Sequence, residues 1–231
     1  MTTGMHARVV AELGAEIVSG ALAPGSVLRL ESLQTRFGVS RTAAREVVRV
    51  LEALRLTTSK RRVGITVQAP DRWNHYDPLV IRWQLDGPAR PAALRVLTEL
   101  RHAVEPIAAR CAATSATPEQ RGALRATAQR LAAATGDLDV FLGHDIAFHD
   151  LVLRASGNPM FAQLSAVVAE VLTGRTGHGL MPAEPHPHAV ALHLEVADAI
   201  AAGAPGRAES AMRAIVTQAH AEIADLTGKS P

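Results

Sequence analysis

The sequence predicts a mainly α-helical protein with two domains, and three features support this prediction. Aromatic residues make up only 3% of the 231 residues, and much of the apolar content is alanine, leucine and valine, which favours packed helices over a sheet sandwich. Apolar residues also recur at helical spacing along most of the chain. Finally, a segment rich in proline and glycine at 70–91 separates a basic N-terminal part from an acidic remainder.

The uneven charge suggests that the two parts have different partners. Residues 1–70 hold ten Lys/Arg and five Asp/Glu, whereas the rest of the chain holds fourteen and seventeen; nine of the ten histidines follow residue 70. A basic domain favours nucleic acid, although an excess of five charges also arises by chance. The single cysteine, Cys111, excludes a disulfide framework. No stretch reaches the roughly 20 apolar residues of a membrane span, so we expect a cytoplasmic protein with no membrane partner.

The first domain is predicted over residues 1–69. Apolar residues at helical spacing indicate helices over 6–19, 30–37 and 40–56. Gly20 and Gly38 end the first two helices, and Ser40 can cap the third. β-Branched residues around a basic turn at 60–67 indicate a small hairpin. Three helices followed by a hairpin form the outline of a winged helix-turn-helix.

The second domain is predicted over residues 92–231, after a linker at 70–91 that carries both tryptophans and the only tyrosine. Thr117-Pro118-Glu119-Gln120 forms a capping box with proline at the first helical position. Glycine and proline clusters divide the rest of this part into segments of helical periodicity. We expect an antiparallel bundle of six or seven helices, with helices over 92–115, 118–134, 138–156, 159–175, 188–203 and 206–227.

Basic side chains follow one face of the third predicted helix. Arg41, Arg45 and Arg49 lie at i, i+4 and i+8, opposite an apolar face. Guanidinium groups in such a row suit phosphates and guanine edges in a DNA major groove. Lys60, Arg61 and Arg62 on the hairpin could reach the adjacent backbone or the minor groove. The alternative is an ordinary solvated basic face.

In the second domain, Asp145 and His149 lie at i and i+4 on one predicted helix, so a carboxylate and an imidazole share a face. Such a pair can hold a divalent metal ion, of which Zn²⁺, Mn²⁺ and Ni²⁺ suit oxygen and nitrogen ligands. His193 follows on another predicted helix. The alternative is a hydrogen-bonded pair without a metal.

Two segments of the first 70 residues resemble the DNA-binding domain of the GntR superfamily of bacterial regulators. They are Ala23-Pro24-Gly25-Ser26-Val27-Leu28 and Gly38-Val39-Ser40-Arg41-Thr42-Ala43-Ala44-Arg45-Glu46-Val47. The resemblance implies that Ser40, Arg41, Thr42 and Arg45 contact operator DNA. It also implies that the wing tip near Gly64 enters the minor groove.

The stretch from Ala92 to Asp225 resembles the helical ligand-sensing (FCD) domain of the FadR-type branch of that superfamily. The matching pieces include 99–106, 145–149, 156–159 and 193–200. The resemblance implies that Asp145, His149 and His193 are metal ligands and that Arg101 faces a carboxylate effector. Pairing of Arg101 with Glu105 or Asp145 is the alternative. Ile215 occupies the position of a fourth ligand histidine, and His220 lies about 140° further around the helix, so binding should be weaker.

The function expected from these features is that of a DNA-binding transcriptional regulator that responds to a small organic acid. The fragment Trp73-Asn74-x-x-Asp77-x-x-Val80-x-x-Trp83 resembles the linker of galactonate-responsive members, which favours a sugar acid such as galactonate or gluconate. By family resemblance we expect a homodimeric repressor. The alternatives are a metal-dependent hydrolase or lyase that uses Asp145, His149 and His193, and a purely architectural nucleic-acid binder.

Overall fold

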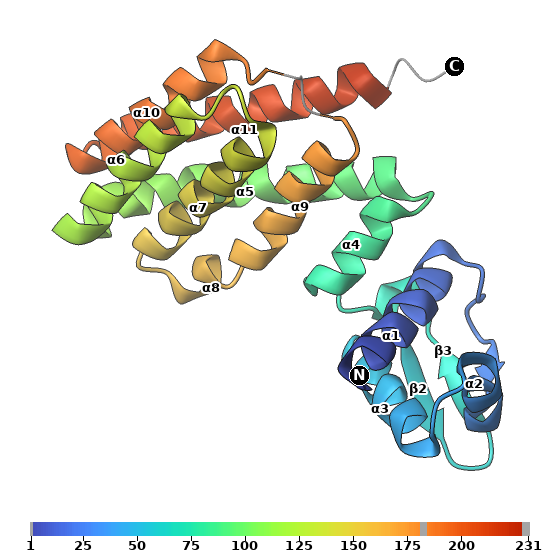
Figure 1. Cartoon of the computed structure of the whole chain (residues 1–231). Helices are drawn as coiled ribbons and strands as arrows, with labels where there is room; N and C mark the ends of the chain where they lie inside the picture. Colours follow the sequence, from blue (N-terminus) through green and yellow to red (C-terminus); the bar gives the residue numbers. More distant parts are fainter. Residues whose placement is uncertain (1, 181–183, 228–231) are drawn as a thin grey trace. The chain divides into compact units, whose positions relative to one another are not determined.

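The computed structural model describes residues 2–180 and 184–227. The chain forms two compact units, Met1–Arg90 and Pro91–Pro231. Both are dominated by helices, and a single small sheet lies in the first unit of the described chain (Figure 1). This confirms the predicted mainly α fold. In the described part, no helix combines the length and the apolar character that crossing a membrane requires.

The first unit has the element order of a winged helix-turn-helix. It begins with α1 (Thr2–Ser19), followed by α2 (Leu30–Phe37) and α3 (Arg41–Ala53). Gly38 ends α2 in the left-handed conformation at φ +63°, which costs glycine little. The hydroxyl of Ser40 then accepts a hydrogen bond from the amide of Ala43 at 3.2 Å and caps α3. This short turn fixes the start of α3.

The sheet is larger than the predicted hairpin. It contains β1 (Val27–Leu28), β2 (Thr57–Lys60) and β3 (Gly64–Val67) in the order β1-β3-β2, and all pairs are antiparallel. Thr66 of β3 pairs with Val27 on one side and with Thr58 on the other. The strand β1 escaped prediction because two residues are too few to carry an alternating pattern.

Much of the segment at 70–91, predicted as a linker, is folded onto the first unit. Residues Pro70–Arg72 form a 3₁₀ turn (η1), and Pro78–Asp86 form α4, which packs on α1. The carboxylate of Asp77 caps α4 by accepting from the amide of Leu79 at 2.9 Å. Trp83 packs directly over Gly14 of α1, where an added Cβ would lie 2.2 Å from the indole ring.

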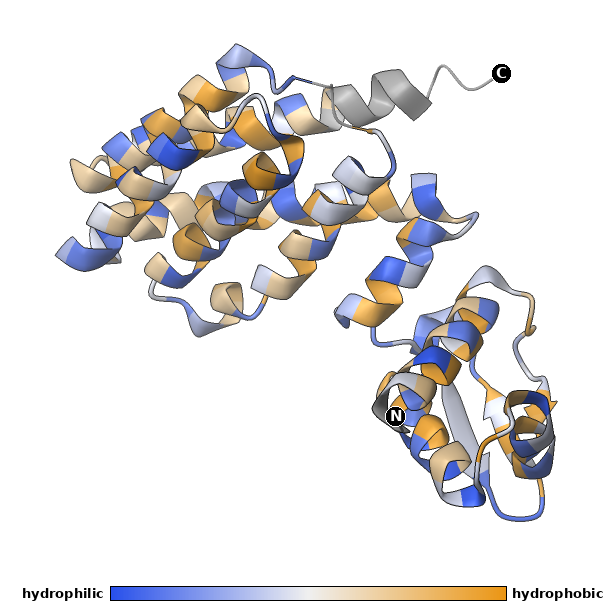
Figure 2. Ribbon diagram, in the orientation of Figure 1, coloured by the Kyte–Doolittle hydropathy of each residue, from blue (hydrophilic) through white to orange (hydrophobic). Residues whose placement is uncertain are grey.

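The second unit is a helical bundle. Its elements are α5 (Arg90–Ser115), α6 (Pro118–Ala133), α7 (Leu138–Ala155), α8 (Pro159–Ala162), α9 (Ser165–Gly177), α10 (Pro187–Ala201) and α11 (Pro205–Thr227). The helix predicted over 159–175 is therefore two helices, since the chain turns at 163–164. Helix α10 packs on α6 and α11, and α7 packs on α6 and α9. Along these helices apolar and hydrophilic residues alternate (Figure 2), as one buried face per helix requires.

Candidate DNA-binding surface and candidate metal centre

The exposed face of α3 carries the residues predicted to contact DNA. These are Ser40, Arg41, Thr42, Arg45 and Arg49, and all five are exposed. The opposite face is buried in the core of the first unit through Ala44, Val47, Val48 and Leu51. Arg49 pairs with Glu46 at 2.6 Å, whereas Arg41 and Arg45 form no ion pair with any described residue. Their guanidinium groups are therefore available to a polyanionic ligand.

The wing presents its basic residues at the turn between β2 and β3. Arg61 and Arg62 are exposed there, and Arg62 adopts a positive φ of 68°. The local structure explains why residue 64 is a glycine. Its φ is +115°, and an added Cβ would lie 2.9 Å from Val27 of β1. Glycine at this position therefore lets β1 and β3 approach, independently of any role at a DNA groove.

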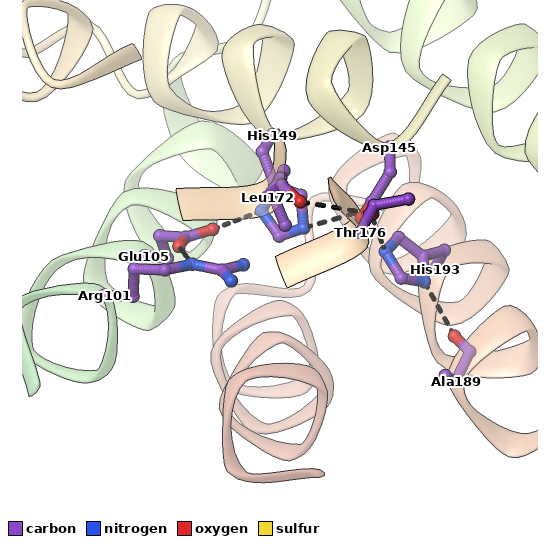
Figure 3. A network of polar contacts seen from close by, with 8 residues as sticks. All are labelled: Arg101, Glu105, Asp145, His149, Leu172, Thr176, Ala189 and His193. Atoms are coloured by element: carbon purple, nitrogen blue, oxygen red, sulfur yellow. Dashed lines mark hydrogen bonds and ion pairs between the residues drawn. The ribbon is translucent and has the colours of Figure 1, made fainter. Parts of the chain in front are cut away.

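Helices α7 and α10 bring Asp145, His149 and His193 together in the second unit (Figure 3). All three are buried, and one potential ligand atom from each lies within 4.8 Å of the others. Oδ1 of Asp145 is 3.1 Å from Nε2 of His193 and 3.4 Å from Nε2 of His149. The three residues predicted as metal ligands thus occupy one site.

The outer contacts of the two imidazoles determine which nitrogen faces this site. Nδ1 of His149 contacts Oε2 of Glu105, and Nδ1 of His193 donates to the carbonyl of Ala189 at 2.7 Å. A neutral imidazole that donates from Nδ1 has its lone pair at Nε2. Both Nε2 atoms then face the carboxylate of Asp145, so three acceptors converge. Converging buried acceptors require a cation, either a metal ion or a proton, between them.

The electrostatics of the metal-free cluster are consistent with this requirement. Burial opposes the charged form of each group, but the neighbours outweigh it. Glu105 and Asp145 raise the pKa of His149 to about 9, and the contacts with His149 and His193 hold the pKa of Asp145 well below its usual range. Arg101 and His149 lower the pKa of Glu105 to about 2 despite complete burial. Without a metal ion, a proton on His149 is the cation that the cluster holds.

Arg101 pairs with Glu105, which is the alternative arrangement considered for it above. Its side chain is 3% exposed, and its Nε donates to Oε1 of Glu105 at 2.5 Å. Arg101 also lines the cavity beside the Asp145 cluster. Glu105 therefore joins Arg101 on α5 to His149 on α7 (Figure 3). The spacing of Arg101 and Glu105 made their pairing an alternative, but no pattern indicated the contact between Glu105 and His149, which lie far apart in the sequence.

The cavity beside the cluster is small. Its volume is about 40 Å³, enough for an ion with a few waters and well below the roughly 300–1,000 Å³ of typical ligand pockets. Arg175, His186 and Gln218 also line it, and no sequence pattern indicated these three residues. Ile215 is buried in its wall and cannot ligate a metal. The side chain of His220 lies outside the described residues.

Comparison with known proteins identifies the family of both units. Residues 5–67 match the bacterial regulatory proteins of the gntR family, and residues 96–218 match the FCD domain. The galactonate operon transcriptional repressor of Escherichia coli is 36% identical over 74% of this chain and 75% of the relative. A probable D-xylose utilization operon transcriptional repressor of Paenarthrobacter nicotinovorans is 31% identical over 85% of this chain and 79% of the relative.

Among solved structures, E. coli McbR/YncC has a TM-score of 0.55 at 19% identity and covers 96% of this chain and 98% of that chain, a likeness that concerns the fold. The matched family and these relatives are transcriptional regulators and not enzymes, which excludes the hydrolase or lyase alternative. The chain therefore belongs to the GntR family of DNA-binding transcriptional regulators and carries an FCD domain in its C-terminal unit.

Proposed function

We propose that this regulator is a repressor, and that a small organic acid bound at the Asp145–His149–His193 site releases it from its operator. The convergence of three buried acceptors beside a buried arginine carries the proposal. A cation between the acceptors and the guanidinium of Arg101 would together attract a carboxylate. Sugar acids are the favoured class because the relative from E. coli is a galactonate operon repressor.

The site would hold one divalent ion through Nε2 of His149, Nε2 of His193 and a carboxylate oxygen of Asp145. Zn²⁺, Mn²⁺ and Ni²⁺ all accept this combination of nitrogen and oxygen ligands. Glu105 and the carbonyl of Ala189 would fix both imidazole rings by hydrogen bonds at Nδ1. With Ile215 in the wall, three protein ligands leave positions for water or for a carboxylate. Binding is therefore expected to be weaker than in a site with four ligands.

Effector binding would require the cavity to open. Galactonate or gluconate cannot enter a volume of about 40 Å³, so the wall has to move when the acid binds. An effector changes operator affinity only when it binds the two conformations with different affinity. A pocket that is closed in one conformation and open in the other meets this condition.

The DNA interface would consist of the exposed face of α3 and the wing. Arg41 and Arg45, with Ser40 and Thr42, would enter the major groove, and Arg61, Arg62 and Gly64 would lie near the adjacent minor groove. A homodimer would present two copies of this surface to a roughly palindromic operator. Light scattering that gives twice the chain mass of 24.4 kDa, with two chains bound per duplex, would support this assembly.

An operator-binding titration tests the function as a whole. The probe is a duplex selected from random sequence by the full chain, and the additions are galactonate, gluconate and, as a neutral control, galactose. We expect the acids to weaken operator binding by about 5–150-fold, the usual range of allosteric coupling, and galactose to have no effect. A chain that binds the selected duplex equally well with every acid would contradict the proposed effector class.

A further inference from the structure

A groove in the first unit lies between the start of α2, α3 and the wing. It is lined by five exposed cations and two carboxylates. The cations are Arg29, Arg45, Arg49, Lys60 and Arg61, and the carboxylates are Glu31 and Glu52. Positive charge predominates on α3 and on the wing, and the five cations outnumber the two carboxylates, so the groove suits a polyanion. Arg29 is the only one of the five basic residues that lies outside α3 and the wing.

Arg29 occupies a position where an arginine is locally unfavourable. It is the N-cap residue of α2, with extended backbone at φ −108° and ψ 140°, and its side chain does not cap the helix. Serine, threonine, aspartate and asparagine are the residues that stabilise this position. A cation also meets the positive end of the helix dipole there. Residues that break a local rule of this kind are expected at functional sites.

We infer that this groove holds one phosphodiester strand of duplex DNA, and that Arg29 binds a phosphate in it. The inference rests on the DNA interface proposed above and extends it to a third element. With α3 in the major groove and the wing near the minor groove, the backbone between the two grooves of DNA passes between α3 and the wing. Arg29 contacts that strand from the start of α2. Its contact positions the duplex and does not discriminate between bases.

The test compares Arg29→Asn with the unmodified full chain. Asparagine is a favourable N-cap, so the melting temperature should be retained or raised. Affinity is measured by fluorescence anisotropy over a series of salt concentrations, on the selected operator and on a scrambled duplex. We expect binding to weaken about five- to tenfold on both duplexes, with an unchanged ratio between them. The slope of log affinity against log salt should fall by about 0.9, the value for one lost phosphate contact.

Two further variants serve as controls. Arg29→Lys keeps the charge and should restore most of the affinity and the full salt slope. Arg72→Asn removes an exposed arginine of the first unit outside the groove, and it should leave both measurements unchanged.

Unchanged affinity and salt slope in Arg29→Asn would overturn the inference. A loss confined to the operator would overturn it as well, because Arg29 would then contact a base. If Arg45→Ala weakens operator binding while Arg29→Asn does not, the proposed function stands and this inference fails. Failure of the unmodified chain to select any duplex would instead contradict the proposed function.

Discussion

The orientation of His149 and His193 is set by residues outside the proposed ligand set. Glu105 and the carbonyl of Ala189 contact the two Nδ1 atoms, which leaves each Nε2 directed at Asp145. Such outer partners fix the tautomer and the ring orientation of metal-binding histidines. The proposed site is therefore preorganised without a metal ion, and its affinity depends on α5 as well as on α7 and α10.

A double substitution of the two histidines should abolish metal binding. We expect protein purified without chelator or His-tag to contain about one divalent ion per chain, and His149→Ala/His193→Ala to contain almost none. His144→Ala is the matched control, since His144 lies on α7 but outside the cluster. Elemental analysis measures the content. Equal metal content in the double variant and the control would place the ion elsewhere.

Arg101 should contribute to effector affinity rather than to DNA affinity. Arg101→Ala would leave the buried carboxylate of Glu105 without its cationic partner and would destabilise the fold. Arg101→Lys is the better variant, because it keeps the charge and loses the forked donor geometry. We expect the sugar acid concentration for half-release from the operator to rise roughly 10–100-fold, which corresponds to a charged hydrogen bond of about 1.5–3 kcal/mol.

Operator affinity without acid should stay unchanged in Arg101→Lys. Arg95→Lys is its control, because Arg95 lies on the same helix and is exposed. A normal response to the acid in Arg101→Lys would assign the carboxylate to the metal ion alone.

Arg45 should determine sequence specificity. It is exposed on α3 and has no ion pair with any described residue, so its guanidinium can form paired hydrogen bonds with a guanine edge. We expect Arg45→Ala to weaken binding to the operator by roughly 1–3 kcal/mol and to weaken binding to a scrambled duplex much less. Arg61→Ala should affect both duplexes equally and mainly reduce the salt slope. Full operator affinity in a folded Arg45→Ala chain would remove Arg45 from the interface.

At the scale of elements, the sequence predicted the long helices well and the short elements badly. Helices α5, α6 and α7 match their predicted ranges within about two residues because each has a clear cap or break and several turns of periodicity. Helix α4 has nine residues between prolines and glycines, a composition that usually marks a linker. Trp83 of this helix packs against Gly14 of α1, and no local pattern encodes that contact.

Arg121 of α6 should stabilise the second unit by joining helix ends. Its guanidinium donates to the carbonyls of Ala116 and Ala201 at 3.1 Å each, and to that of Ala113 at 3.4 Å. These carbonyls lie at the ends of α5 and α10, where helices leave acceptors without partners. We expect Arg121→Met to lower the free energy of unfolding of this unit by about 1.5–3 kcal/mol.

Arg125→Met provides the matched control for this effect. Arg125 also lies on α6 and reaches α10, but its pair with Asp198 is solvent-exposed, so the loss should stay below about 1 kcal/mol. Urea denaturation followed by circular dichroism measures both variants. Equal losses would show that the helix-end contacts add no stability.

At the scale of the whole molecule, the candidate site combines local and long-range information. The spacing of Asp145 and His149 was visible in the sequence, and family resemblance added His193. The contact between Glu105 and His149 results from the packing of α5 near α7, and no local pattern records it. The chain segment that joins α4 of the first unit to α5 of the second is short and contains only residues 87–89. If the proposed effector signal travels through the chain from the FCD unit, it would therefore reach α4 first.

Packing of α4 on α1 should consequently be required for release from DNA. Alanine at position 14 favours the helix by about 1 kcal/mol, but its Cβ would displace the ring of Trp83 and loosen α4. We expect Gly14→Ala to bind the operator with nearly normal affinity, because α3 and the wing stay folded, and to lose most of its response to the sugar acid.

Gly4→Ala is the matched control, since Gly4 lies on the same helix with open space around it. Adding Trp83→Leu to Gly14→Ala removes the clash and should restore part of the response. Anisotropy titrations with and without galactonate compare the three variants. A normal response in Gly14→Ala would show that the signal reaches α3 without the α1–α4 contact.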